Sequence, residues 1–373
     1  MSRAFLLAAR RTAVAPRGGA FREVEAHDLA APVLHACLAD AGLAPVAVDH
    51  VILGNALSGG GNVARLAALA AGLPDSVPAL TLDTQCCSGL DAIMLAARLV
   101  ESGAARAVLA GGVESWSRAP LRARRPKAPG EEPVFYERPP FAPWPQRDPD
   151  LVTAMAALAR AQGIAREAQG AFAVASHAAA LAARAILEPE IVPVAGLGRD
   201  AFTRALEARL CARAPVLAGE GEFAVDATGV AVEADAAAAV LVVAPEGLPE
   251  ARRPGIAFLD AASAGAAPEE PAMALVPAAR RLMEHHKRAP ACVELMESFA
   301  AQALANIAAL GLDPARVNRG GGALARGHPI GASGAILAVR LFHELGRETP
   351  GALGLAAIAA AGGLGSALML QRV

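Results

Sequence analysis

The chain has 373 residues, enough for about two to three domain-sized units with substantial hydrophobic cores. Its 34 basic and 36 acidic residues give a net charge of -2, which excludes the strong positive field of nucleic-acid-binding or anionic-membrane-binding proteins. The five cysteines are scattered and form no disulfide framework, so we expect a reducing, cytoplasmic compartment.

Apolar runs alternate with helical periodicity through the first third of the chain. Strands and helices are predicted in turn at residues 4–9, 28–42, 50–57, 63–73, 79–85, 88–103 and 106–112. Strands separated by helices in this way form parallel-rich sheets with crossover helices. The sequence therefore predicts an α/β fold.

Residues 116–150 interrupt this alternation. They contain nine prolines and the basic run RAPLRARRPK at residues 118–127, which predict a loop excursion. Helical patterns follow at residues 151–163 and 167–185, and the apolar run at residues 236–243 predicts a buried strand.

The alternation returns near residue 255, with predicted elements at residues 255–261, 272–286, 291–296, 298–310 and 331–345. The uncharged stretch 353–370 is long enough to span a bilayer. However, Gly362 and Gly363 divide it into two strand-length runs, so we expect a buried hairpin and no membrane span. The two halves look like one fold used twice.

We expect three regions. They are a first core half at residues 1–117 that is completed by residues 234–247, a loop domain at residues 118–233, and a second core half at residues 248–373.

Cys86 lies in the segment TLDTQCCSGLDA (residues 81–92), where a predicted strand leads into a turn of small residues and then a helix. The free N–H groups and the dipole at a helix start favour the thiolate, which is the nucleophilic form. His328 lies in GHPIGASG (residues 327–334) and is a candidate base. Taken alone, Cys86 fits a buried packing residue, and His328 fits a loop histidine bonded to backbone carbonyls. Together the two segments favour a Cys/His covalent mechanism.

These two segments resemble the signatures of the thiolase family. Further matches, in the family's order, are AARRTA (8–13), HVILGNAL (50–57), AGGVES (110–115) and AGGLG (361–365). The resemblance implies a duplicated βαβαβαββ core in five α-β-α-β-α layers with an inserted loop domain. It also implies a homodimer or homotetramer that uses a coenzyme A thioester as substrate and holds no permanent cofactor.

The resemblance implies roles for three groups at the reacting centre. Cys86 would carry an acyl group as a thioester, and His328 would polarise the thiol of Cys86. The backbone N–H groups of Cys86 and Ala361 would hold the oxyanion.

The resemblance also implies contacts to coenzyme A. Thr228 of DATG (226–229), together with Ser298 and Phe299 of MESF (296–299), falls on positions that contact pantetheine in the family. The basic run at residues 118–127 resembles a tetramerisation loop near which basic residues meet the phosphates, although it also fits a solvated arm. The family's HMG stretch reads PDL at residues 149–151, which implies a reshaped acyl pocket.

Two positions on which the family's chemistry depends are altered. The asparagine of its NEAF motif is Met296, and the cysteine of its CxG motif is Ala359. Ala359 cannot shuttle a proton and Met296 cannot hold the water that stabilises the enolate. We therefore expect acyl-enzyme formation but impaired Claisen chemistry, unless Glu297, Ser298 or Cys292 substitutes.

Three functions fit this sequence: an acyl-CoA acyltransferase with an atypical second step, a thioesterase-like variant or one with a non-carbon acyl acceptor, and a non-catalytic acyl-CoA-binding or scaffold subunit. We expect no metal site, because the adjacent His285 and His286 should point in different directions on a helix. No other group of His, Asp or Glu has ligand spacing.

Overall fold

The computed structural model describes residues 3–244, 246 and 255–373. The first core half contains, in chain order, β1 (Phe5–Thr12), α1 (Ala26–Ala41), β3 (His50–Gly54), α2 (Val63–Ala70), β4 (Ala79–Leu82), α3 (Ser88–Glu101) and β5 (Ala107–Glu114). The strand β11 (Ala234–Val243) completes it after the inserted region. These elements confirm the predicted alternation.

The second core half repeats this pattern. It contains β12 (Ile256–Gly265), α8 (Leu275–His286), β13 (Cys292–Leu295), α9 (Ala300–Leu310), α11 (Ile330–Leu345), β14 (Leu353–Ala360) and β15 (Leu364–Arg372). The counterpart of β4 is reduced to one parallel bridge between Val317 and Val293. β14 and β15 form the predicted antiparallel hairpin, with Gly362 and Gly363 at its turn in the left-handed region.

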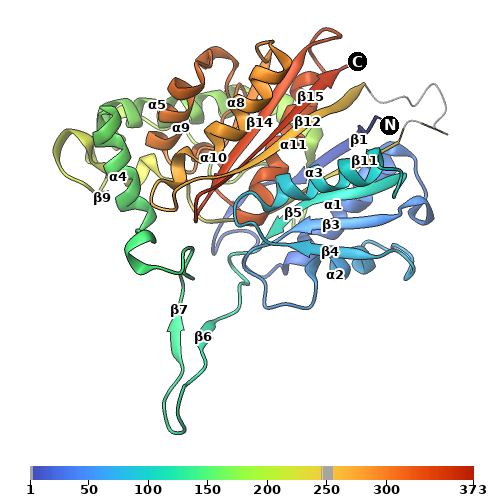
Figure 1. Ribbon diagram of the computed structural model, residues 1–373, viewed down its shortest axis with the longest axis horizontal. Helices are drawn as coiled ribbons and strands as arrows, with labels where there is room; N and C mark the ends of the chain where they lie inside the picture. Colours follow the sequence, from blue (N-terminus) through green and yellow to red (C-terminus); the bar gives the residue numbers. More distant parts are fainter. Residues whose placement is uncertain (1–2, 245, 247–254) are drawn as a thin grey trace.

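The elements stack in five layers, as Figure 1 shows. The strand order is β13-β14-β15-β12-β1-β11-β5-β3-β4, and the two halves join where β1 pairs with β12. Helices α3 and α11 pack against each other between the two halves of this sheet, α1 and α2 cover the outside of the first half, and α8 and α9 cover the outside of the second. The predicted α-β-α-β-α architecture is confirmed.

The central layer is close-packed because small residues meet there. A Cβ atom added to Gly112 of β5 would lie 1.9 Å from the carbonyl oxygen of Gly331 at the start of α11. A Cβ atom added to Gly89 of α3 would lie 2.7 Å from the same oxygen, and one added to Gly334 would lie 2.6 Å from the amide nitrogen of Leu90. Backbones can approach so closely only where no side chain intervenes, so these glycines bring the starts of α3 and α11 together.

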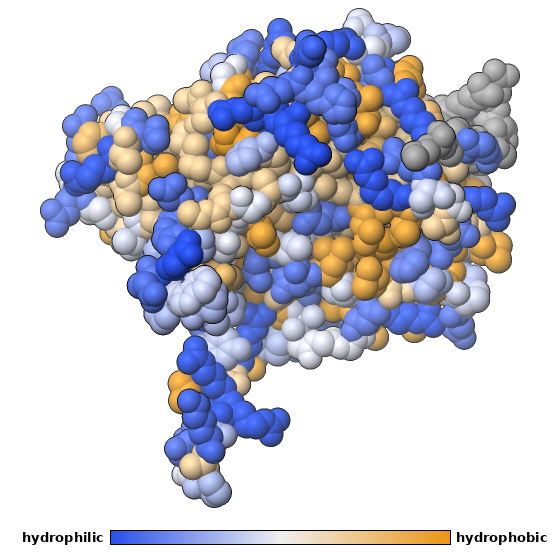
Figure 2. All heavy atoms as spheres, viewed as in Figure 1, coloured by the Kyte–Doolittle hydropathy of each residue, from blue (hydrophilic) through white to orange (hydrophobic). Residues whose placement is uncertain are grey.

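The inserted region contains α4 (Leu151–Gln162), α5 (Arg166–Ala182), α6 (Arg184–Leu187), α7 (Ala208–Arg213) and the short strands β6 (Arg122–Arg124), β7 (Val134–Tyr136), β8 (Ile191–Val192), β9 (Val216–Ala218) and β10 (Val225–Asp226). The predicted loop excursion includes the β6–β7 hairpin, an arm that projects from the body and is covered largely by hydrophilic side chains (Figures 1 and 2). Apolar side chains are also exposed on this arm: Leu121 at 88%, Val134 at 64% and Phe135 at 68%.

The domain boundaries given above stay a prediction, and the junction between residues 247 and 248 lies outside the described residues. Within the described ranges, no single helix is long and apolar enough to cross a membrane. The bent pair at Arg166–Ala182 and Arg184–Glu190 passes that test by length and composition only.

Candidate active site

Cys86 lies in the turn between β4 and α3. Gln85, which precedes it, has a left-handed backbone with φ of 56°, a conformation that costs a non-glycine residue roughly 1–2 kcal/mol. The hydroxyl of Ser88 holds this turn, since it donates to the Gln85 carbonyl (2.6 Å) and accepts from the Thr84 amide (2.8 Å). The turn therefore fixes the direction of the Cys86 side chain.

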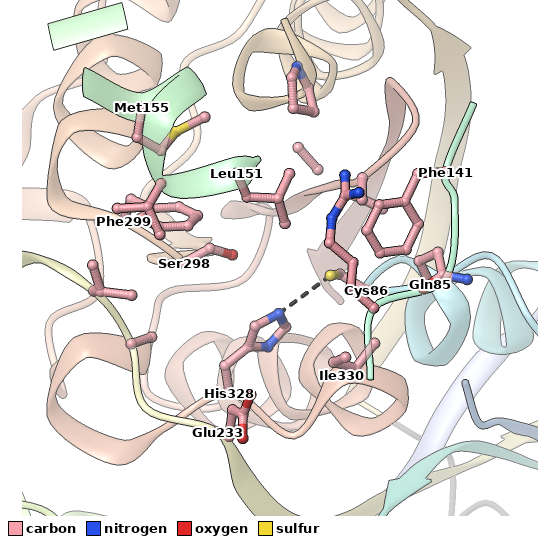
Figure 3. Close-up of a pocket in the computed structure, with 18 of the residues that line it drawn as sticks. Gln85, Cys86, Phe141, Leu151, Met155, Glu233, Ser298, Phe299, His328 and Ile330 are labelled. Atoms are coloured by element: carbon pink, nitrogen blue, oxygen red, sulfur yellow. Dashed lines mark hydrogen bonds between the residues drawn. The ribbon is translucent and has the colours of Figure 1, made fainter. Parts of the chain in front are cut away.

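His328 lies in the loop before α11, and its Nε2 is 3.2 Å from Sγ of Cys86 (Figure 3). Its Nδ1 is 2.6 Å from the hydroxyl of Ser333, which itself donates to the Pro329 carbonyl at 2.9 Å. Because that hydroxyl has given its hydrogen to Pro329, it accepts the Nδ1–H of the imidazole. The lone pair of Nε2 therefore faces the thiol of Cys86.

Burial raises the pKa of Cys86 to about 12 and lowers the pKa of His328 to about 4. The resting pair is thus a neutral thiol and a neutral imidazole. The expectation of a resting thiolate was wrong for a physical reason: desolvation outweighs the favourable backbone N–H groups near the sulfur. In addition, α3 begins only at Ser88.

Two backbone donors lie beside the sulfur. The N–H groups of Cys86 and Ala361 both act to lower the pKa of the Cys86 thiol, which places them next to Sγ. Ala361 follows β14 directly, and it is absent from the described non-glycine residues with positive φ, so an alanine fits there without strain. The pair is therefore placed to donate to an oxyanion formed at Cys86.

The buried carboxylate of Glu114, at the end of β5, joins loops from both core halves. It accepts hydrogen bonds from the Asn55 side chain (2.8 Å) and from the amides of Ala56 (3.1 Å), Leu57 (3.2 Å) and Gly331 (2.9 Å). Burial raises its pKa to about 7. Sequence reasoning gave no role to Glu114 or to Ser333, although both lie inside quoted motifs. A match to a sequence motif does not reveal which loops a carboxylate will hold.

Cys86 and His328 open into a cavity of about 360 Å³. Its wall is largely apolar and is formed by Leu57, Gln85, Cys86, Trp116, Glu137, Arg138, Pro139, Phe141, Asp150, Leu151, Val152, Met155, Val230, Ala231, Glu233, Pro271, Ala272, Ser298, Phe299, Gln302, His328, Ile330, Ala359, Ala360 and Ala361. Figure 3 shows the side chains of several of these residues, among them Leu151, Ser298 and Phe299, above the Cys86–His328 pair. The cavity is large enough for a small acyl group and part of its carrier.

The predicted coenzyme A contacts fall in two places. Ser298 and Phe299 line the cavity, whereas Thr228 is absent from its wall and donates its hydroxyl to Asp226 at 2.6 Å. The basic run at residues 118–127 contributes nothing to the wall, but the segment after it contributes Arg138 and Phe141.

The two positions at which the chain departs from the family motifs lie in different environments. Ala359 lines the cavity, but Met296 is 1% exposed and packs in the hydrophobic core. Neither Glu297 nor Cys292 reaches the wall. The carboxylate of Glu297 accepts from Ser176 (2.7 Å) and Asn318 (2.6 Å) and is therefore part of the scaffold.

Comparison with known families places the chain. The family model described as "Thiolase, N-terminal domain" matches residues 4–246, and "Thiolase, C-terminal domain" matches residues 253–372. The chain belongs to the thiolase family. The α/β architecture described above is accordingly the thiolase fold.

Named relatives span the whole thiolase chain. "Putative acetyl-CoA C-acetyltransferase VraB" of Staphylococcus aureus is 34% identical over 394 residues and covers 100% of both chains. "Putative acetyl-CoA C-acetyltransferase YhfS" of Bacillus subtilis is 37% identical over 381 residues, or 99% of each.

Two solved structures are also similar. The acetyl-CoA acetyltransferase of Bacillus anthracis has a TM-score of 0.91 at 30% identity and covers 100% of this chain and 99% of its own. The Acat5 thiolase of Ascaris suum in complex with coenzyme A has a TM-score of 0.89 at 29% identity, with 100% of both chains covered.

Proposed function

We propose that this thiolase-family acyltransferase takes an acyl group from a coenzyme A thioester onto Cys86. The observation that carries the proposal is the 3.2 Å approach of Cys86 Sγ to His328 Nε2 inside the cavity. His328 takes the thiol proton as Sγ attacks the carbonyl carbon. The N–H groups of Cys86 and Ala361 hold the oxyanion, and the bond to the sulfur of coenzyme A then breaks. That sulfur takes the proton from His328, leaving acyl-Cys86 and free coenzyme A.

Coenzyme A would enter past Ser298 and Phe299, which line the cavity, and Thr228, although outside the wall, is kept as a proposed contact on the family resemblance alone. The Ascaris suum relative was solved with coenzyme A, which supports this class of carrier. The apolar wall favours an acyl group over a charged substrate. A role in fatty acid metabolism is proposed on this ground, and a cytoplasmic location on the scattered cysteines.

The second step distinguishes this chain from a standard thiolase. Ala359 faces the cavity without a titratable group, and Met296 lies in the core. These observations favour a second candidate, in which water or a non-carbon nucleophile accepts the acyl group without removal of an α-proton. A non-catalytic acyl-CoA-binding or scaffold subunit is the third candidate, and the retained Cys/His pair argues against it.

Intact-protein mass spectrometry tests the proposal. After incubation with acetyl-, propionyl- and longer acyl-CoA, the protein should gain one acyl mass, located on the Cys86 peptide. Cys86→Ala should abolish the gain, and Cys211→Ala, which removes a cysteine far along the chain and outside the cavity wall, should retain it. No mass gain with any donor would leave only the scaffold reading.

The enzyme is expected to be at least a homodimer. It would be a homotetramer if the β6–β7 arms of one dimer bind a second dimer. The outer edge of β4 ends the strand order, and edge strands offer unpaired N–H and C=O groups to another chain. Leu121 and Phe135 are exposed on the arm. Sedimentation velocity at micromolar concentration should therefore show a dimer or tetramer, and a monomer would contradict the inferred architecture.

A further inference from the structure

A second group of ionisable side chains lies in the second core half, outside the cavity wall. Asp260 is on β12, and His285 and His286 end α8. Oδ2 of Asp260 lies 3.2 Å from Nδ1 of His285 and 3.4 Å from Nε2 of His286, and the three atoms lie within 4.8 Å of one another. The expectation that adjacent histidines point apart does not hold here, because the two rings stack with their centroids 4.7 Å apart and both approach the carboxylate of Asp260.

These spacings suit a shared ion. Zinc binds imidazole nitrogen and carboxylate oxygen at about 2.0–2.2 Å, so neighbouring ligand atoms of a tetrahedral zinc site stand about 3.3–3.5 Å apart. The two distances from Asp260 Oδ2 to the imidazole nitrogens fall close to this value. Two imidazoles and one carboxylate with an open fourth position also form a ligand set typical of zinc and neighbouring transition metals.

The surroundings orient the carboxylate. Oδ1 of Asp260 accepts from the amide of Ala261 at 2.8 Å and from the guanidinium of Arg98 at 3.3 Å. Oδ2 is thereby turned toward the two histidines. Hydrogen bonds that fix one oxygen of a ligand are the usual outer-shell support of a metal site.

The nitrogen of His286 supplies an independent indication. Its Nε2 is buried and has no hydrogen-bond partner, although Asp260 is only 3.4 Å away. A buried polar atom without a hydrogen-bond partner calls for an explanation, and a bound ion is one of the few available. The position at the end of α8 adds to this, because the carboxyl end of a helix dipole favours a cation.

One side chain must move for all three atoms to bind. The stacked rings are nearly parallel, at 12°, so their lone pairs do not converge on one point. The side chain of His285 is 69% exposed and is free to turn out of the stack. The side chain of His286 is only 19% exposed, so its neighbours hold it in place. The exposed ring of His285 therefore rotates to meet a bound ion, whereas the 3.4 Å spacing between Asp260 Oδ2 and His286 Nε2 is kept.

We propose that Asp260, His285 and His286 bind one divalent transition-metal ion of the zinc class, with water in the fourth position. The ion ties the end of α8 to β12. It takes no part in acyl transfer, because none of the three residues lines the cavity.

The test is calorimetric titration of zinc into protein that carries no affinity tag, in a Cys86→Ala background so that the cavity thiol cannot bind zinc. We expect one ion per chain, and at least about tenfold weaker binding in Asp260→Asn and in His286→Gln. His35→Gln, which removes an exposed histidine from α1, should bind as the parent does. Melting temperatures in chelator establish that each variant folds.

Cobalt supplies a second readout on the same proteins. Visible absorption typical of tetrahedral nitrogen and oxygen ligation should appear with the parent and disappear with Asp260→Asn. The proposal is overturned if zinc does not bind saturably, or if folded Asp260→Asn and His286→Gln variants bind it as tightly as His35→Gln.

Discussion

Combining Ala359→Cys with Met296→Asn should raise thiolysis of acetoacetyl-CoA well above that of the parent enzyme. Position 359 lines the cavity beside the Cys/His pair, so a thiol there would supply the missing proton shuttle. Acid–base groups of this kind are typically worth about 10² to 10⁴ in rate. Ala359→Cys alone should give most of this gain, because Met296 packs in the core and is absent from the cavity wall, whereas Ala359 lines it.

The controls separate chemistry from stability. Ala359→Ser adds a side chain of similar size that is a far weaker acid and should bring little gain. Met296→Asn places an amide in the hydrophobic core cluster that also contains Cys87 and Ile358. This costs about 1–3 kcal/mol if the amide finds no partner, so melting temperatures accompany the rates. Robust thiolysis by the unmodified enzyme would refute the expectation that Ala359 and Met296 impair Claisen chemistry. No gain from the double variant would indicate a pocket rebuilt for another acceptor.

His328→Asn should slow acylation of Cys86 by about 10² to 10⁴, the range expected when a general base is lost. The pH profile gives a sharper signature. With pKa values of about 4 for His328 and about 12 for Cys86, the neutral thiol–imidazole pair predominates between these limits, and His328 removes the thiol proton as Sγ attacks. Alkylation of Cys86 by iodoacetamide should therefore be nearly independent of pH from about pH 6 to 9.

In His328→Asn the thiol must ionise to solvent, so its alkylation rate should rise about tenfold per pH unit over the same range. Ser333→Ala removes the acceptor of the imidazole Nδ1–H. In this variant the alkylation rate should rise with pH more steeply than in the parent and less steeply than in His328→Asn. A parent profile that rises as steeply as that of the variant would show that His328 does not take the proton.

The sequence predicted the fold well because its information is local and repeated. The apolar period of helices such as α11 and the strand-length runs around Gly362 and Gly363 survive in the structure almost residue for residue. The β6–β7 arm escaped prediction, since its strands are three residues long and its prolines point only to a loop.

The site was predicted less evenly. Motifs identified Cys86 and His328, which the fold brings into contact across a sequence separation of 242 residues. They did not indicate that burial would keep the thiol protonated, because desolvation depends on every neighbour and not on position at a helix start. They also did not indicate that Ser333 fixes the imidazole tautomer.

The division of the pair between the two halves has a consequence for how the enzyme is made. The first half supplies the sulfur and the second supplies the imidazole, 242 residues later. At roughly 5–20 residues per second, the ribosome needs about 12–48 s to bridge that interval. Throughout it the nascent chain carries the thiol without its base. Under the proposed mechanism, acyl transfer to Cys86 can therefore begin only when α11 has packed between the sheets, so the first appearance of acyl transfer would mark the assembly of the two halves.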